Sequence, residues 1–155
     1  MRGKIAGEYI YRCWWKTWRE GAYSIILTKA AFLHHDYFKQ YTYSMPKEIK
    51  DYVDNIRNCE DLAMQFLISN TSSLPPLYVQ GHLSDLGTLG GISTSKNVLL
   101  AGHMNSRSQC LNDLSNFYRG MPLIKSHVVV HSASNMWTYS PATWWEYFSS
   151  DLWKF

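Results

Sequence analysis

The sequence RNCEDLAM occupies residues 57–64 and places two adjacent carboxylates, Glu60 and Asp61, at the beginning of a segment with helical spacing. Asn58 precedes them as a favourable N-cap residue, and acidic side chains in a first turn suit the helix dipole. The apolar positions that would form the buried stripe of this helix are Leu62, Ala63, Phe66 and Leu67. The two carboxylates would then lie at the rim of the core, within reach of a cleft. By themselves, these residues favour helix capping over a functional pair.

The residues on both sides of this stretch predict alternating strands and helices. Met45-Pro46 opens a helix, because proline suits a first turn. A third helix is predicted from about residue 106 to residue 118, with Gly120 as its C-cap. Strands are predicted at residues 23–28, 77–79 and 123–131, a loop or helical turn at 30–37, and a long irregular segment at 81–106. This pattern is typical of an α/β fold with a mixed sheet and flanking helices.

The composition is that of one globular domain with a hydrophobic core. Of the 155 residues, 46% are hydrophobic and 17% are charged, a globular rather than a disordered balance. No apolar run approaches the roughly 20 residues of a membrane helix, and the first residues lack the apolar centre of a signal peptide. The formal net charge of +3 suits an anionic partner such as a nucleotide-sugar, but it is common in proteins that bind nothing acidic. We expect no nucleic-acid partner.

Aromatic residues are unusually abundant, with seven Trp, eleven Tyr and six Phe. Most of them gather near the two ends of the chain, at residues 9–23 and 137–153. Such rings can stack on sugars, but they also dominate the packing of protein cores. Core packing, or the covering of a missing neighbour, is therefore favoured over a glycan-handling surface.

Common enzyme motifs are absent from the sequence. It contains no G-x-S-x-G elbow, no phosphate loop with Gly-Lys-Ser/Thr and no G-x-G-x-x-G. Gly87, Gly90 and Gly91 are interpreted as ordinary turn residues. The run His34-His35-Asp36 is not interpreted as a metal site, because adjacent histidines seldom point the same way and no distant third ligand is evident.

The three cysteines, Cys13, Cys59 and Cys110, leave one odd thiol in any disulfide scheme and match no zinc pattern. Cys59 could pair with a histidine as a thiol nucleophile, but no spacing supports this, and a structural cysteine is favoured. Asn70 begins the N-glycosylation sequon Asn-Thr-Ser, which has meaning only for a chain on the secretory route.

Residues 58–64 resemble the N-C-[ED]-D-[IL]-A-M signature of exostosin-type α-N-acetylhexosaminyltransferases. Residues 14–24 resemble that family's W-W-x-x-W-x-x-G-x-Y-S, and residues 27–37 resemble its L-[ST]-K-A-A-F-x-H-x-x-Y. Shorter matches continue the series at Met45-Pro46, Pro75-Pro76, residues 107–112 and residues 121–123. The resemblance covers about residues 9–131 in one order, and it reverses the preference against a functional pair of carboxylates.

The resemblance implies a GT-A fold, in which a nucleotide-binding half with a D-x-D metal motif precedes an acceptor-binding half. Residues 1–135 would be the C-terminal, acceptor-side part of such a domain, and residues 136–155 an aromatic tail of unknown role. The family transfers GlcNAc or GalNAc from a UDP-sugar to a glycan or glycolipid acceptor, with retention of configuration and with Mn2+. The implied location is the Golgi or ER lumen, with membrane association, and association through exposed aromatic surface is expected where a missing half would bind.

The same resemblance assigns roles to individual side chains. Asp61 would be the carboxylate nearest the reacting anomeric carbon, and Arg107 would contact the UDP diphosphate. Asn58 and Glu60 would hold donor-sugar hydroxyls. A fixed carboxylate stabilises oxocarbenium-like charge, and a guanidinium fork suits phosphate oxygens.

A disulfide between Cys59 and Cys110 is also implied by the resemblance. It would anchor the helix of Asp61 beside the helix of Arg107. Cys13 would then stay free, in a position where the family usually has Gly or another residue.

The sequence departs from the family at its front, because none of its seven aspartates forms D-x-D. We therefore expect the nucleotide-binding half to be missing and the chain alone to be inactive. A catalytically inactive glycan- or partner-binding module is the alternative hypothesis. A thiol enzyme that uses Cys59 is a remote third.

Overall fold

The helices carry most of the fold in this computed structural model, which describes residues 2–5, 8–12, 19–81 and 100–131. The α-helices are α2 (His35–Lys39), α3 (Lys47–Ile56), α4 (Glu60–Ser72) and α5 (Leu100–Phe117). A 3-10 turn, η1 (Thr28–Ala30), precedes α2, and a π-helical turn, η2 (Gln40–Ser44), lies between α2 and α3. The strands are β1 (Arg2–Ile5), β2 (Glu8–Tyr11), β3 (Tyr78–Val79) and β4 (Val129–Val130). No helix among the described residues is long and apolar enough to cross a membrane.

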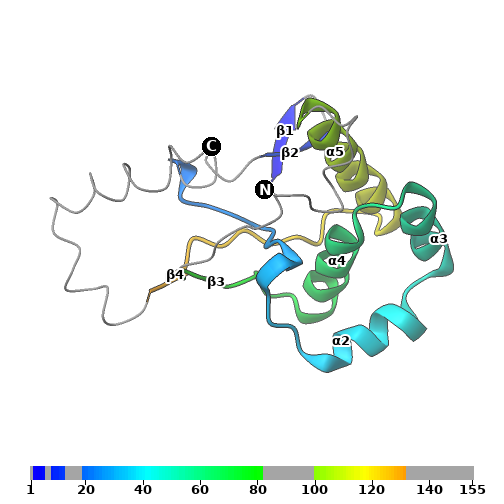
Figure 1. Cartoon of the computed structure of the whole chain (residues 1–155), viewed down its shortest axis with the longest axis horizontal. Coiled ribbons are helices and arrows are strands. Elements are labelled where there is room, and N and C mark those ends of the chain that lie inside the picture. Colours follow the sequence, from blue (N-terminus) through cyan, green and yellow to red (C-terminus); the bar gives the residue numbers. More distant parts are fainter. Residues whose placement is uncertain (1, 6–7, 13–18, 82–99, 132–155) are drawn as a thin grey trace, which may run out of the picture.

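Helix α4 lies at the centre, with α3 and α5 packed beside it (Figure 1). Eight of its thirteen residues are buried, so the helix is covered on nearly all sides. The core that surrounds it is formed mainly by Ile49, Val53, Leu62, Ala63, Phe66, Leu111, Leu114 and Leu123. The predicted helices at α3, α4 and α5 are confirmed, and α5 begins at Leu100, earlier than expected.

The strands form two separate pairs in place of the single mixed sheet predicted. β1 and β2 pair antiparallel as a hairpin against α5, which the sequence did not predict, and β3 pairs parallel with β4 (Figure 1). The α/β class holds, because helices and strands are both present and both pairing directions occur.

The strand predicted at residues 23–28 is largely wrong. Among the described residues, one bridge, Tyr23 with Ser126, joins this segment to the strand predicted at residues 123–131. Of that second predicted strand, only β4 and the residue in this bridge are paired. The physical reason lies in Gln65 of α4, whose side-chain amide binds both backbone groups of Ile26. This side chain takes the hydrogen bonds that a neighbouring strand would otherwise supply.

The helix ends differ from the expected caps. Cys59, not Asn58, is the N-cap of α4 and has a left-handed backbone with φ of 69°, while Asn58 accepts a 2.7 Å hydrogen bond from the N–H of Cys59. After α5 the left-handed residue is Arg119, with φ of 53°, rather than Gly120. The N–H groups of Arg119 and Gly120 donate to Asn116 and Ser115, a Schellman arrangement in which Gly120 is one residue too late to be the left-handed cap.

Candidate functional site

Asp61 and Arg107 form a buried ion pair between α4 and α5. Nη2 of Arg107 lies 2.5 Å from Oδ2 of Asp61, and each side chain is only 7% exposed. Oδ1 of Asp61 accepts a 2.8 Å hydrogen bond from the backbone N–H of Leu62. The first turn of α4 therefore fixes one carboxylate oxygen, and α5 fixes the other.

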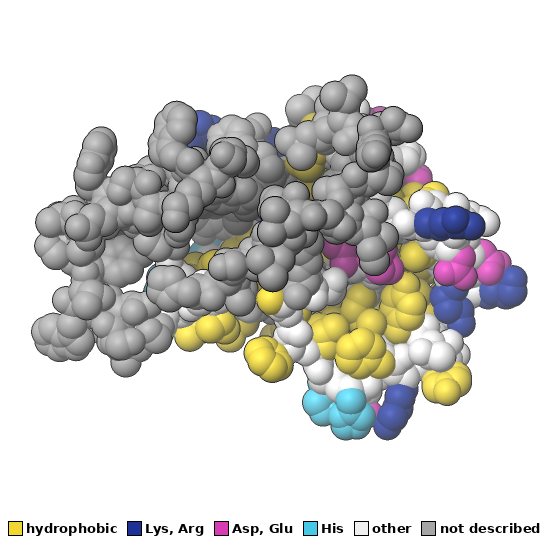
Figure 2. Space-filling model, in the orientation of Figure 1, with side chains coloured by type: hydrophobic (Ala, Val, Ile, Leu, Met, Phe, Trp, Pro, Cys, Tyr) yellow, Lys and Arg dark blue, Asp and Glu magenta, His cyan; other side chains and the backbone are white. Residues whose placement is uncertain are grey.

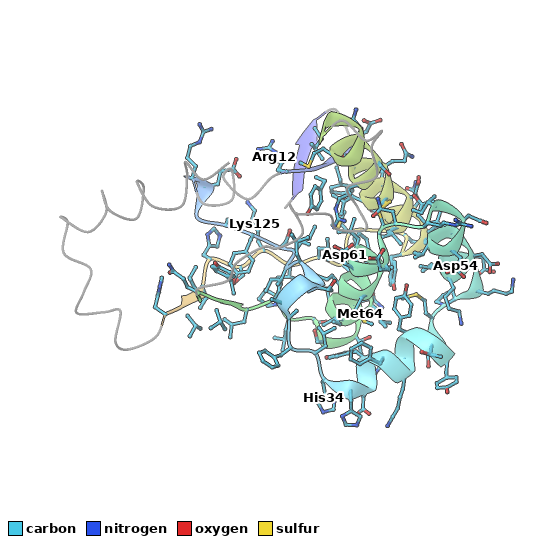
Figure 3. The ribbon with its side chains drawn as sticks, in the orientation of Figure 1. Arg12, His34, Asp54, Asp61, Met64 and Lys125 are labelled. Atoms are coloured by element: carbon cyan, nitrogen blue, oxygen red, sulfur yellow. A yellow bond between two sulfur atoms is a disulfide. The ribbon has the colours of Figure 1, made fainter. Side chains whose placement is uncertain are left out.

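The junction before α4 positions this carboxylate. Arg57 and Cys59 both have left-handed backbones, with φ of 50° and 69°, although neither is glycine. Such residues are costly and persist only where the surrounding structure holds them. Here the chain turns sharply between α3 and α4, so that Asp61 enters the first turn of α4 facing α5 (Figure 3).

A disulfide joins Cys59 and Cys110, with a Cα–Cα distance of 6.4 Å. Both cysteines are buried. Cys59 precedes Asp61 by two positions and Cys110 follows Arg107 by three, so the covalent link lies close to the ion pair. The pairing that the resemblance implied is present, and it ties the two helices together where their charges meet.

The ring of Tyr11 covers one side of the Arg107 guanidinium, whose Cζ lies 4.5 Å from the ring centroid. Burial by itself lowers the pKa of Arg107, but the hydrogen bond and charge of Asp61, with a smaller effect of Tyr11, give a net rise. Arg107 is thus a permanent cation. Within the described part of the chain, its Nε–H is buried and has no hydrogen-bond acceptor.

A buried cation with one unmatched N–H can bind a further oxygen ligand. An N–H of this kind costs about 1–3 kcal/mol when it has no acceptor, and a guanidinium suits phosphate or carboxylate oxygens. An anion could bind here beside a fixed carboxylate once the atoms that cover this N–H move aside.

Asn58 and Glu60 lie at the same junction but outside the ion pair. Asn58 is half-buried and directs its amide oxygen to the N–H of Cys59. Glu60 is exposed. Burial of Tyr41 is the main cause of the raised pKa of that residue, and the negative charge of Glu60 adds to it. Glu60 therefore faces the side of α4 where η2 lies.

His34, His35 and Asp36 form an exposed cluster whose ligand atoms all lie within 4.8 Å of one another. The expectation that the two histidines point apart is wrong, because their ring centroids are 4.5 Å apart. Asp36 is already paired with Lys39, and Nδ1 of His34 accepts from the N–H of Asp36 as the N-cap of α2. This local pairing explains the cluster as a helix start, well away from Asp61 (Figure 3) and open at the surface where α2 lies (Figure 2).

Other residues singled out in the sequence are placed as follows. Asn70 is exposed on the last turn of α4. Exposed aromatic side chains are present at Phe32, Phe38 and Tyr43. Three sets of residues lie outside the described ranges: Cys13, the three turn glycines of residues 87–91 and all seven tryptophans.

The sequence did not reveal the contact of Tyr11 with Arg107, or the part that Ser108 and Asn112 play in placing β2. These side chains accept hydrogen bonds from the backbone of Tyr11 and Tyr9. The partners are far apart in the chain, so no local spacing connects them. The only signal of this contact in the sequence was the alternation of aromatic residues, Tyr9 and Tyr11, in a short segment.

Comparison with known proteins assigns this chain to a family. The model of the glycosyl transferase family 64 domain matches residues 2–137. Glycosylinositol phosphorylceramide mannosyl transferase 1 of Arabidopsis thaliana is 38% identical over 132 residues, covering 85% of this chain and 38% of that protein. Exostosin-1b of Danio rerio is 36% identical over 107 residues, which are 68% of this chain and 14% of that protein.

The exostosin-like-3 homolog of Caenorhabditis elegans is 37% identical over 101 residues, or 64% of this chain and 12% of that protein. The chain thus spans well under half the length of each of these relatives. The family match nevertheless covers most of the chain, including Asp61, Arg107 and both bridged cysteines. The exostosin-like resemblance is confirmed, and the chain belongs to glycosyltransferase family 64.

Proposed function

We propose that this chain is the acceptor-side part of a GT-A-type domain that transfers a sugar, with retention, from a UDP-sugar to a glycan or glycolipid acceptor. Residues 1–135 would form this part. Family membership supports the reaction class. The observation that carries the proposal is the buried contact between Asp61 and Arg107, because it places a carboxylate and a guanidinium together.

Asp61 is proposed as the carboxylate nearest the anomeric carbon. Retaining sugar transfer passes through oxocarbenium-like charge, which a fixed carboxylate stabilises. The hydrogen bond from Leu62 and the pairing with Arg107 hold this side chain in one orientation. A carboxylate that is already in place stabilises the transition state more effectively, because it does not have to reorient during the reaction.

Arg107 is proposed to contact the diphosphate of the donor. As the sugar leaves, negative charge develops on the phosphate oxygens, and a nearby guanidinium stabilises it. The buried Nε–H without an acceptor in the described structure supports this role. Asn58 and Glu60, at the same junction, are proposed to bind hydroxyl groups of the donor sugar.

The carboxylate of the ion pair does not fit the Mn2+ that the family resemblance implies. The one carboxylate in the ion pair, Asp61, has one oxygen bound to Arg107 and the other to a backbone N–H. The sequence has no D-x-D pair elsewhere. We therefore derive no step through a metal ion, and any Mn2+ would need carboxylates other than these.

The donor sugar is proposed as GlcNAc or GalNAc, with mannose as the competitor that the Arabidopsis relative's name suggests. That name also includes a phosphorylceramide, which supports a glycolipid acceptor. Membership of the exostosin-like family supports the secretory route, so we propose a location in the ER or Golgi lumen with membrane association. Exposed aromatic side chains such as Phe32 offer a surface for association.

The test measures binding of UDP-GlcNAc, UDP-GalNAc and a mannose nucleotide by calorimetry, and release of the nucleotide with Mn2+ present. We expect Arg107→Lys to weaken donor binding about tenfold, since it removes the guanidinium fork. Asp61→Asn should abolish any nucleotide release, while Asp54→Asn, an exposed carboxylate on α3, serves as the control. Glycan binding without any affinity for nucleotide-sugars would assign the chain to the alternative, a catalytically inactive glycan- or partner-binding module.

A further inference from the structure

The free edge of β2 is bound by side chains of α5. Asn112 donates from Nδ2 to the carbonyl of Tyr9 and accepts at Oδ1 from the N–H of Tyr9, each at 2.8 Å. Both backbone groups of one residue are thereby satisfied by one amide, as a neighbouring strand would satisfy them. The hairpin's outer edge is therefore closed by a helix.

Ser108 continues this edge one turn earlier on α5. Its Oγ accepts from the N–H of Tyr11 at 3.0 Å and donates to the carbonyl of Met104 at 2.9 Å. Residues four apart on a helix lie on one face, and alternate residues of a strand direct their backbone groups to one edge. The spacing of Ser108 and Asn112 on the helix therefore fits the spacing of Tyr11 and Tyr9 on the strand, so that Ser108 binds the backbone of Tyr11 and Asn112 binds that of Tyr9.

This docking determines where the Tyr11 ring lies. Ser108 directly follows Arg107, so the residue that binds the backbone of Tyr11 is adjacent to the residue that the ring covers. The guanidinium is then held by Asp61 through Nη2 and by the Tyr11 ring on one face. Each contact reduces the number of orientations that Arg107 can adopt.

We infer that Asn112 and Ser108 are positioning residues for Arg107. By binding the free edge of β2, they hold the Tyr11 ring against the guanidinium and keep it in one orientation beside Asp61. Their importance for sugar transfer rests on the proposed function, since it is there that the orientation of Arg107 matters. The positioning itself is a property of this chain that can be measured without a donor.

The experiment measures the rate at which phenylglyoxal modifies Arg107 in the full chain, mapped by peptide mass spectrometry. Exposed Arg57 in the same sample provides the reference rate. The variants are Asn112→Ala, Ser108→Ala, Tyr11→Leu, Tyr11→Phe and the double variant of Asn112→Ala with Tyr11→Leu. The matched control is Asn116→Ala, which removes an exposed asparagine one turn further along α5.

We expect Tyr11→Leu and Asn112→Ala each to raise the relative rate at Arg107 roughly fivefold to tenfold, which lies between the scales of an exposed and a desolvated cation–π contact. Ser108→Ala, which removes one hydrogen bond, should give a smaller rise in the same direction and serves if Asn112→Ala does not fold. Asn116→Ala should stay near the wild-type rate. Tyr11→Phe keeps the ring but removes the hydroxyl that also bonds to Arg107, so its rate should fall between those of the wild type and Tyr11→Leu. The double variant should match Tyr11→Leu alone, because both changes act through the same ring.

An unchanged rate in folded Asn112→Ala and Ser108→Ala would overturn the inference. So would a double variant in which the two effects multiply, since that would mean independent structural damage. Donor affinity is measured afterwards on the same proteins. If the wild type binds no nucleotide-sugar, the role proposed for Arg107 at the donor diphosphate fails, while the modification rates still decide whether Asn112 and Ser108 position Arg107.

Discussion

Arg107 donates a hydrogen bond to Asp61 at 2.5 Å, across 46 positions of sequence and between two helices that a disulfide also joins. Both charges are withdrawn from water. Burial of two ions is costly unless each is well paired. The contact is therefore both the basis of the proposed chemistry and a point where a single substitution should damage the fold.

We predict that Asp61→Leu destabilises the chain by about 3–5 kcal/mol, because it leaves the guanidinium of Arg107 buried without a counter-charge. The double variant Asp61→Leu with Arg107→Met should be destabilised much less than the two single changes together, since neither charge remains. Urea unfolding followed by circular dichroism measures this. Asp51→Asn, which breaks the exposed pair with Lys47, is the control and should have little effect. Additive effects in the double variant would contradict the prediction.

The disulfide should contribute substantially to stability. It closes a loop of 51 positions, and the chain-entropy picture gives about 4 kcal/mol for a loop of this length. We expect Cys59→Ala with Cys110→Ala to lower the free energy of unfolding by about that amount. Because both cysteines are buried, reductant should cleave the bond slowly unless denaturant is present. Alkylation and mass spectrometry measure how fast the bond is lost. Rapid loss in native buffer would show that the disulfide is accessible and would contradict this prediction.

Stability should fall in alkaline solution. Burial and the 2.6 Å hydrogen bond to Asp113 raise the pKa of Tyr52 well above its ordinary value of 10.0. The unfolded chain therefore loses this proton first, so the stabilisation is fully present below about pH 10 and is lost above it. Tyr41 and Tyr118 also have raised pKa values, chiefly through burial.

The measurement is the urea midpoint at pH 8 and at pH 10.5. Tyr52→Phe should be less stable than the wild type at pH 8 but should lose less stability between the two values. Tyr43→Phe, which changes an exposed ring, should lose as much stability between the two pH values as the wild type. An equal loss of stability in the wild type and in Tyr52→Phe would show that the Tyr52 hydroxyl has no part in the alkaline destabilisation.

The sequon at Asn70 should carry a glycan when the chain is produced in a secretory host. Asn70 is exposed on the last turn of α4, so the side chain can accept the sugar without disturbing the core. We expect an electrophoretic shift that glycosidase treatment removes and that Asn70→Gln and Ser72→Ala abolish. Thr71→Ala, which keeps the sequon, should retain it. A glycan on the Ser72→Ala variant would place the modification elsewhere.

The sequence by itself predicted helices α3, α4 and α5 and named the two charged residues, Asp61 and Arg107, that the structure brings into contact. Periodic apolar positions such as Ile49 and Val53 in α3, or Leu62 and Phe66 in α4, fix a helix through local geometry, because a turn repeats every few residues. The family signature around Asp61 and Arg107 is likewise a local pattern that can be read without coordinates.

Only the tertiary structure decided how the strands pair and what surrounds Arg107. The backbone of Ile26 is bound by the side chain of Gln65 and that of Tyr9 by Asn112, so two extended segments end against helices instead of in one sheet. The Tyr11 ring reaches Arg107 for the same reason. Such contacts join residues distant in the chain, and their formation depends on three-dimensional packing that local propensity does not encode.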